Sequence, residues 1–265
     1  IASCLVGSEM CIRDSIYVRG TSAPISGTRI GNRGECRNIT FDAPKTVYWN
    51  QAAGGNWSGT NWAASAGGAV NDQYFPLAQD TATFVNTGLN ASATVTWDTA
   101  ITYSGSVDMS ARTNAMTLAG TTTTTIYGNW SNGSGTTLSI TGASTFSGGG
   151  TQTITSAGKS FSCNITIDTY GGTVQLADAL NIGLNILTVT NGTFNTQGYA
   201  VTAAGLSSSS SNVRAISLGA STLTFSATTP VTFTTSTNLT LNSGTSTINL
   251  SSTGSAIFAG GGLSF

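Results

Sequence analysis

The sequence predicts an all-β protein, a right-handed parallel β-solenoid (β-helix) with an N-terminal aromatic-rich cap. From about residue 90 onward, apolar residues alternate with Thr or Ser and then meet a Gly-containing turn, as in AMTLAG, TLSITG and LTLNSG. Alternation with period two is typical of strands that bury one face. The turns recur at irregular separations of about 8 to 25 residues, which favours coils of variable length over a strict propeller or leucine-rich array.

Composition narrows the class of function. Charged residues make up 7% of the 265 residues, the net charge is −1 and the chain contains no His. Low charge with much Ser, Thr and Gly is also typical of disorder, but β-branched residues placed with period two indicate a folded chain. The charge balance excludes a basic footprint for nucleic acid. No apolar run reaches the length of a membrane span, and imidazole chemistry is excluded outright.

The first residues form a segment of their own. Residues 5–15, LVGSEMCIRDS, resemble the conceptual translation of a sequencing adapter, and residues 1–4 fit the same adapter. We therefore expect residues 1–15 to be adapter-derived and non-native, and the gene to be a metagenomic fragment that is truncated at its C-terminal end as well. A natural N-terminal segment is the alternative.

Outside that segment two distant cysteines remain, Cys36 and Cys163. Their separation indicates neither a disulfide framework nor a metal-ligand spacing. In FSCNITI, Cys163 alternates in phase with apolar neighbours. We expect a small core residue there, with a reactive thiol as the alternative.

Residues 16–44 differ in composition from the rest of the chain and are expected to be the end of a preceding β module. IYVRG and NITFDAP are predicted strands on either side of a Gly-rich loop. This part of the chain holds the arginines Arg19, Arg29, Arg33 and Arg37. Such a cluster is typical of a solvated polar face, and a phosphate-bearing or acidic partner is the alternative.

Residues 45–89 are rich in aromatic side chains, and we expect them to form the cap. Trp49, Trp57 and Trp62 lie close together in the sequence. Trp49 ends the predicted strand VYW, and the other two lie in the long loop that joins it to the predicted strand TATFV. Each large aromatic side chain buries roughly 150–250 Å², so this loop is expected to fold over the open end of the stack, where a repeat array needs a cover. Stacking on sugar rings is the alternative role, with Tyr48, Trp57 and Trp62 as the candidate carbohydrate-binding residues.

Residues 90–265 hold the solenoid repeats, in which alternate side chains are expected to point inward. The predicted inward pairs are Met116 and Leu118, Leu138 and Ile140, Ile165 and Ile167, Leu187 and Val189, and Leu239 and Leu241. Outward positions take Thr and Ser, and Thr combines high β-propensity with solubility. TLSITGASTFSGGG (137–150) aligns without gaps with NLSSTGSAIFAGGG (249–262), as expected for a repeating coil.

Carboxylate chemistry on a polysaccharide is the enzymatic option that remains. Beyond residue 45 the acidic residues are Asp72, Asp80, Asp98, Asp108, Asp168 and Asp178. Asp98 and Asp108 are ten residues apart, about half a coil, which does not stack them on one face as a glycosidase pair requires. We expect these side chains to bond turn backbone instead. We predict no catalytic residue, no cofactor and no metal site, because the Asp-rich calcium loop is also missing.

Two resemblances bear on function. YWNQAAGGNWSGTNWA resembles the opening that precedes β-helical stretches in autotransporter-like bacterial surface proteins. Over residues 16–265 the chain is more similar to repetitive virion structural proteins of marine bacteriophages, on phrases such as FDAPKTVYWN, FPLAQDTATFVN and GTQTITSAGKSF.

The second resemblance implies a non-enzymatic component of a virion or tail fibre. Its location would be the virion or the extracellular cell surface. Its partners would be a cell-surface glycan or other virion subunits, with a homotrimer as one assembly. A secreted autotransporter-like adhesin passenger is the second hypothesis, and a polysaccharide-active β-helix enzyme is the third.

Overall fold

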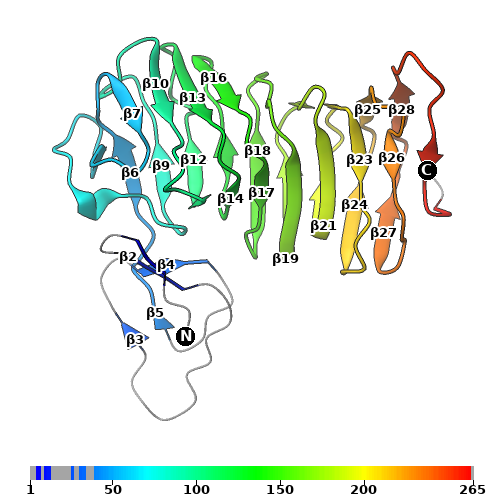
Figure 1. Ribbon diagram of the computed structural model, residues 1–265, viewed down its shortest axis with the longest axis horizontal. Coiled ribbons are helices and arrows are strands. Elements are labelled where there is room, and N and C mark those ends of the chain that lie inside the picture. The colour runs from blue at the N-terminus through cyan, green and yellow to red at the C-terminus, as the bar shows by residue number, and fades with distance from the viewer. Residues whose placement is uncertain (1–3, 7–8, 13–24, 27–29, 34–38, 264–265) are drawn as a thin grey trace.

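The structure is a computed structural model that describes residues 4–6, 9–12, 25–26, 30–33 and 39–263. The described residues form strands, turns and one short 3-10 helix, η1 (Asp72–Tyr74). Figure 1 shows the strands side by side along the long axis, from β6 and β7 at one end to β28 at the other. Within the described part of the chain, no helix has the length and apolar character needed to cross a membrane.

The repeating unit is a coil of three short strands, and equivalent strands of successive coils pair in parallel to form three columns. The first column contains β11 (Tyr103–Ser104), β14 (Thr124–Ile126), β17 (Ser144–Phe146), the start of β19 (Ile165–Leu176), the start of β21 (Ile186–Asn195), β23 (Gly205–Ser207), β26 (Val231–Thr232) and β29 (Phe258–Ala259). The predicted parallel β-solenoid is therefore confirmed.

The second column follows the first in each coil. It contains β6 (Thr46–Trp49), β9 (Thr81–Thr83), β12 (Ser106–Asp108), β15 (Trp130–Ser131), β18 (Thr151–Thr155), the ends of β19 and β21, β24 (Arg214–Ser217) and β27 (Leu239–Asn242). Because β19 and β21 each continue around the corner, they join the first two columns into one sheet.

The third column completes each coil and consists of two sheets. The N-terminal sheet contains β7 (Gly54–Asn56), β10 (Ala93–Thr96), β13 (Met116–Gly120) and β16 (Thr136–Ile140). The C-terminal sheet contains β20 (Leu180–Asn181), β22 (Val201–Ala203), β25 (Thr222–Phe225) and β28 (Thr247–Leu250). Leu187 pairs with Leu206 and Val231 with Phe258, so the coils that follow the aromatic segment vary in length from 19 to 27 residues.

The core lies inside the coils, because alternate side chains of each strand point to the axis. β16 shows the pattern directly, with Thr136, Leu138 and Ile140 buried and the two residues between them exposed. Nine of the ten predicted inward residues are buried, and the tenth, Leu241, is half-buried against the core. Each fully buried aliphatic side chain stabilises the fold by about 1.5–3 kcal/mol.

The sequence repeat corresponds to a structural repeat. Residues 137–150 run from β16 into β17, and residues 249–262 run from β28 into β29. β16 and β28 both belong to the third column, and β17 and β29 both belong to the first. The aligned segments therefore span the same two columns in two different coils. Their register differs by two residues in the first column, where Phe258 lies in line with Ser144 and not with its aligned residue Phe146.

The aromatic segment forms the first coil and covers its edge. β8 (Trp62–Ala63) pairs antiparallel with β6, with Trp49 opposite Trp62, while β6 pairs in parallel with β9 on its other side. The expected cap is thus a reversed strand laid on the outermost solenoid strand. It satisfies an edge that would otherwise be free to pair with another chain.

A stack of aromatic rings continues from the cap into the interior. Trp57 stacks on Trp97 with ring centroids 4.5 Å apart, and Trp97 is parallel to Trp130 at 6.3 Å. Trp49 and Trp62 meet edge to face at 5.3 Å. These geometries are the favourable ones for aromatic pairs, so the cap and the first coils share one core.

Buried polar side chains link neighbouring coils. Gln152 Nε2 donates to the Ile126 and Gly128 carbonyls of the preceding coil at 3.0 and 2.6 Å. Thr196 Oγ1 donates to the Leu218 carbonyl of the following coil at 2.8 Å. The Ile126 and Leu218 carbonyls also accept from the backbone amides of Ser147 and Ser221, so these side chains add a second bond at the corner and tie one coil to the next.

Two small sheets precede the solenoid. In one, β1 (Cys4–Val6) pairs antiparallel with β2 (Glu9–Ile12), and β2 pairs in parallel with β4 (Ile30–Asn32). In the other, β3 (Ile25–Ser26) pairs in parallel with β5 (Ile39–Thr40). β5 lies within the predicted strand NITFDAP, whereas the predicted strand IYVRG lies outside the described residues.

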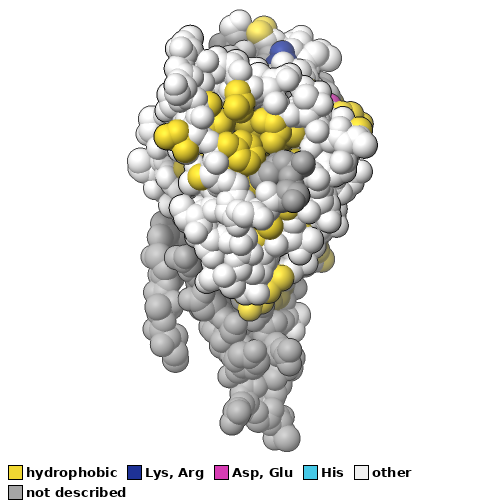
Figure 2. Space-filling model, turned by 90° about the vertical axis from the view of Figure 1, so that its right-hand side faces the viewer, with side chains coloured by type: hydrophobic (Ala, Val, Ile, Leu, Met, Phe, Trp, Pro, Cys, Tyr) yellow, Lys and Arg dark blue, Asp and Glu magenta, His cyan; other side chains and the backbone are white. Residues whose placement is uncertain are grey.

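The C-terminal end exposes apolar side chains. Leu250, Ile257 and Phe258 are 46%, 66% and 42% exposed, and Figure 2 shows hydrophobic side chains gathered at the centre of this end. Ile248, Leu250 and Phe258 line a shallow hollow of about 300 Å³ there. Among the described residues, the terminal strands β28 and β29 each have one paired edge.

Candidate functional site

The predicted carbohydrate-stacking residues do not form a surface site together. Trp57 and Trp62 are 0% and 1% exposed, and Trp62 Nε1 donates to the Trp57 carbonyl at 3.0 Å. Both indoles lie in the cap core, so neither presents a ring face to a sugar. Tyr48 is half-buried on β6 and stays a prediction.

The aspartates mostly bond turn backbone, as expected from their type and position. Asp98 accepts from Ser58 N at 2.9 Å, and Asp108 accepts from Ser110 N at 2.9 Å. The two oxygens of Asp178 accept from Ser156 N and Ala157 N at 2.6 and 2.7 Å.

Two further aspartates accept hydrogen bonds near the cap. Asp80 accepts from Lys45 N and Leu77 N at 2.8 and 2.9 Å, and Asp72 accepts from the Thr60 hydroxyl. Within the described part of the chain, no group of three or more Cys, Asp or Glu is arranged to hold a metal ion.

Cys163 is a core residue. Its side chain is 1% exposed, and its sulfur lies 3.5 Å from Ser144 Oγ. Burial raises the pKa of the Cys163 thiol, against a smaller opposite effect of the hydrogen bonds to Ser144. A protonated, enclosed thiol is unreactive, which confirms the structural interpretation. Cys36 lies outside the described residues.

Of the predicted arginine cluster, Arg33 is the member that the structure describes. Its guanidinium lies 4.5 Å from the Tyr103 ring centroid and 5.4 Å from that of Tyr127. Its Nε also donates to the Tyr127 hydroxyl at 3.1 Å. Arg33 therefore binds the segment after β4 to the side of the solenoid. Arg19, Arg29 and Arg37 lie outside the described residues.

The strongest candidate site is a groove at the corner between the first two columns. This corner is the segment that joins the first-column strand of a coil to its second-column strand. In one coil this segment is shorter than in the coils on both sides. Between paired positions, β19 uses five residues (168–172) where β21 uses three (190–192). On the other side, three residues of β21 (189–191) face six residues (208–213) between β23 and β24. The longer corners form two walls, and the short corner forms the floor.

Glycines allow the short corner to pack closely on the preceding one. Gly192 has φ +74°, and a Cβ there would lie 1.9 Å from Thr169 Oγ1. A left-handed backbone with no room for a side chain requires glycine. Gly171 also has positive φ, at +71°, and it turns the chain directly after Tyr170 at the bend of β19.

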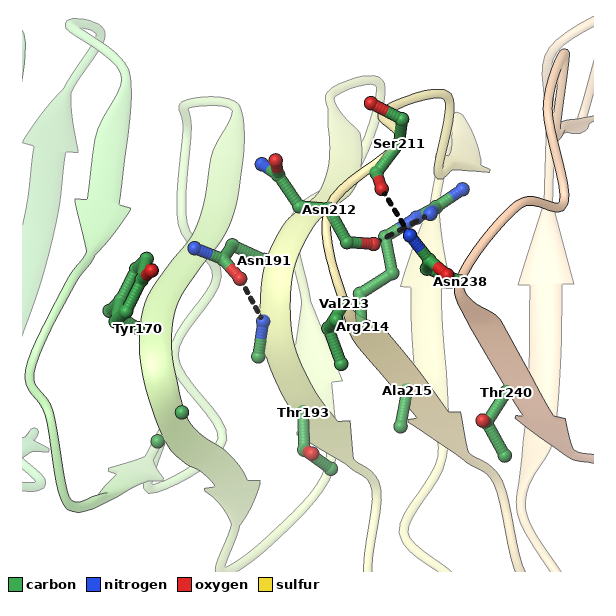
Figure 3. Close-up of a pocket in the computed structure, with 13 residues that line it drawn as sticks. Tyr170, Asn191, Thr193, Ser211, Asn212, Val213, Arg214, Ala215, Asn238 and Thr240 are labelled. Atoms are coloured by element: carbon green, nitrogen blue, oxygen red, sulfur yellow. Dashed lines mark hydrogen bonds between the residues drawn. The ribbon is translucent and has the colours of Figure 1, made fainter.

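The groove has a volume of about 650 Å³ and is lined by residues from four successive coils. Tyr170 and Val213 are 75% and 76% exposed. Figure 3 shows Tyr170 on one side, Asn191 in the middle, and Asn212 and Val213 on the other. Among the described residues, Leu184 is the one large apolar side chain that is more exposed, at 84%, so both walls of the groove offer an apolar contact.

Among the described residues that line the groove, none exposes a charged group. Arg214 contributes to the lining, but its side chain is only 2% exposed. Its guanidinium donates to Ser208 Oγ and to the carbonyls of Ser208, Asn212, Thr235 and Thr237 at 2.6–3.1 Å. Burial lowers the pKa of Arg214. All of its donors are directed at the protein, so Arg214 shapes the wall and offers no hydrogen bond to a ligand.

Sequence reasoning missed this groove. One signal was available, because Tyr170 stands in the outward phase of ITIDTYGG directly before two glycines. The difference in corner length was not accessible, since it depends on the register between coils. Comparison with protein-family models, with curated proteins and with solved structures finds no match for this chain.

Proposed function

We propose that this chain is a non-enzymatic structural protein of a virion or fibre, in which the solenoid acts as a stiff, protease-resistant rod. The observation that carries the proposal is the axial continuity of the stack. The first column runs in parallel register from β11 to β29, and bonds such as those of Gln152 and Thr196 link the interiors of adjacent coils.

Two buried arginines also support a stiff rod, because they link neighbouring coils. Arg112 is fully buried and donates to the carbonyls of Val85, Leu89, Asn90 and Ala115 at 2.7–3.0 Å. Arg214, nearer the other end, donates to four carbonyls and also, through Nε, to Ser208 Oγ. Each guanidinium thereby ties together corners of neighbouring coils, and local opening of one coil would leave a charge and several carbonyls unpaired.

The outer surface supports the same role. On the first column a ladder of hydroxyl side chains runs through Thr125, Thr145, Thr166, Thr188, Ser207 and Thr232. The interior stack is thus enclosed by neutral polar groups rather than by ions. Such a surface keeps a rod hydrated without making its solubility depend on salt.

Limited proteolysis and localisation test the proposal. Incubation of the full chain with proteinase K should leave a resistant product that begins near residue 45, because the backbone amides of the coils are paired. An antibody against residues 90–265 should label density-purified virus particles. Labelling of bacterial outer membranes instead would favour the adhesin, and release of reducing ends from a polysaccharide would favour the enzyme. Rapid cleavage throughout the solenoid would contradict a rod.

A further inference from the structure

We propose that the corner groove between Tyr170 and Asn212 binds a neutral polysaccharide chain. This goes beyond the structural role, because a stiff rod needs no ligand. The groove lies on the side of the solenoid rather than at its end, and its walls come from successive coils. A long polymer can therefore lie across the corner without meeting either terminus.

Tyr170 supplies the apolar platform. It stands on the five-residue corner of β19, is 75% exposed, and makes no ring contact with another described aromatic residue. A tyrosine ring combines a broad apolar face with low conformational entropy, which makes it an effective contact for a partner that is apolar on one face and polar on its edge. A pyranose ring has that character.

Three asparagines supply the polar contacts, and each has one half of its amide held by the protein. Asn191 Oδ1 accepts from Gly192 N at 3.1 Å. Asn212 Nδ2 donates to the Thr190 carbonyl at 3.2 Å, and Asn238 Nδ2 donates to the Ser211 carbonyl at 2.9 Å.

The other half of each amide, namely Asn191 Nδ2, Asn212 Oδ1 and Asn238 Oδ1, makes no hydrogen bond to a described residue. The groove thus presents one donor group and two acceptors whose positions are already set. Sugar hydroxyls both donate and accept, so they match a mixed set of this kind. Side chains that are held in place before binding also lose less entropy when a ligand arrives.

The groove, in its described residues, offers no exposed cationic donor to an anionic ligand. Among its lining residues the charged one is Arg214, and all of its donors are occupied within the protein. A carboxylate- or sulfate-bearing polymer would lose hydration without finding a cation. The volume of about 650 Å³ falls in the range of small-molecule sites, about 300–1,000 Å³.

Affinity electrophoresis of the full chain tests the proposal, with dextran and galactomannan as neutral probes and alginate as the anionic probe. At least one neutral polysaccharide should retard the protein, and alginate should not. Tyr170→Ala should weaken binding by about tenfold, the loss expected from an aromatic contact of roughly 1.5 kcal/mol. Tyr170→Phe should bind within about twofold of the unmodified chain, because it keeps the ring. Asn191→Ala should weaken binding by about threefold.

Tyr199→Ala is the matched control, because Tyr199 is a partly exposed tyrosine outside the groove. It should bind like the unmodified chain, and all variants should melt at the same temperature since the altered side chains are exposed or half-buried. The proposal is overturned if neither neutral polysaccharide retards the protein, if alginate alone does, or if Tyr170→Ala binds as well as Tyr199→Ala. Those results would leave the rod itself untouched, because proteolysis and localisation test it separately.

Discussion

The two ends of the solenoid differ in whether the outermost strand and its apolar side chains are covered. At the N-terminal end, β8 reverses direction to pair with β6, and Trp49, Trp57 and Trp62 fill the space beneath it. At the C-terminal end, Phe258 of β29 and the preceding Ile257 remain exposed. Since each coil of a stack is stabilised mainly by its neighbours, the difference implies that the described solenoid is held firmly at one end and opens first at the other.

The largest expected effect comes from a substitution between the two ends. Leu187 is fully buried and stands in register between Ile165 and Leu206 of the adjacent coils. Leu187→Asp should lower the free energy of unfolding by more than about 5 kcal/mol, because it places an unpaired charge in the core. Thermal melting followed by circular dichroism measures the change. A native melting curve would show that Leu187 does not face inward.

The second largest loss of stability is expected from a substitution in the cap. Trp62→Ala deletes a buried indole that contacts Trp49, Trp57 and Phe84. The expected loss is about 3–5 kcal/mol, the range for truncation of a buried aromatic residue. Hydrogen exchange should show faster opening of β6, β7 and β9.

Leu250→Ala is the control at the other end, where the side chain is 46% exposed. It should cost less than about 1 kcal/mol, because little buried area is lost. Equal losses in the two variants would remove the distinction between a covered and an uncovered end.

A third prediction concerns the polar links within the N-terminal coils. Arg112→Met keeps much of the side-chain volume but removes the donors for four carbonyls. We expect a loss of about 2–4 kcal/mol, because the Val85, Leu89 and Asn90 carbonyls lose their donor. The Ala115 carbonyl keeps its bond from Ser92 N. Chemical denaturation measures it, and a stabilised variant would mean that burying the guanidinium costs more than its hydrogen bonds return.

The smallest effect on stability is expected at the exposed end. Ile257→Ser should change the free energy of unfolding by less than about 0.5 kcal/mol, since the side chain is 66% exposed. It should nevertheless reduce binding of a hydrophobic dye and reduce self-association in sedimentation velocity, because it shrinks an exposed apolar patch. Unchanged dye binding would place the responsible surface elsewhere.

Local sequence patterns were sufficient for the fold and for the inward faces. Alternation in segments such as 165–167 and 187–189 correctly predicted burial, because a strand offers only two faces and the solenoid buries one of them. The role of Asp98, Asp108 and Asp178 in turns followed from residue type alone. The structure confirms local bonds for Asp98 to Ala100 N and for Asp108 to Ser110 N. Asp178 instead accepts from Ser156 N and Ala157 N of the preceding coil.

The features that sequence reasoning missed depend on contacts between coils. Trp57 and Trp62 were candidates both for a cap and for sugar binding, and composition alone does not decide which face of a loop becomes buried. Arg214 lies in phase with Ile216, yet nothing in the sequence shows that neighbouring corners supply its acceptors. The groove beside Tyr170 exists because corner lengths differ between coils, which becomes visible only when the register is known.

The central claim is that successive coils stack in register along one axis, and distances between spin labels test it most directly. Thr125 and Thr232 face outward on the first column and are separated by five strand-to-strand steps. With about 4.8 Å per step, labels introduced as unnatural amino acids should lie about 24 Å apart, and labels at Thr145 and Thr232 about 19 Å apart. The solenoid would be contradicted if the two distances did not differ by one step of about 4.8 Å. It would also be contradicted if the distances fitted strands that pair antiparallel.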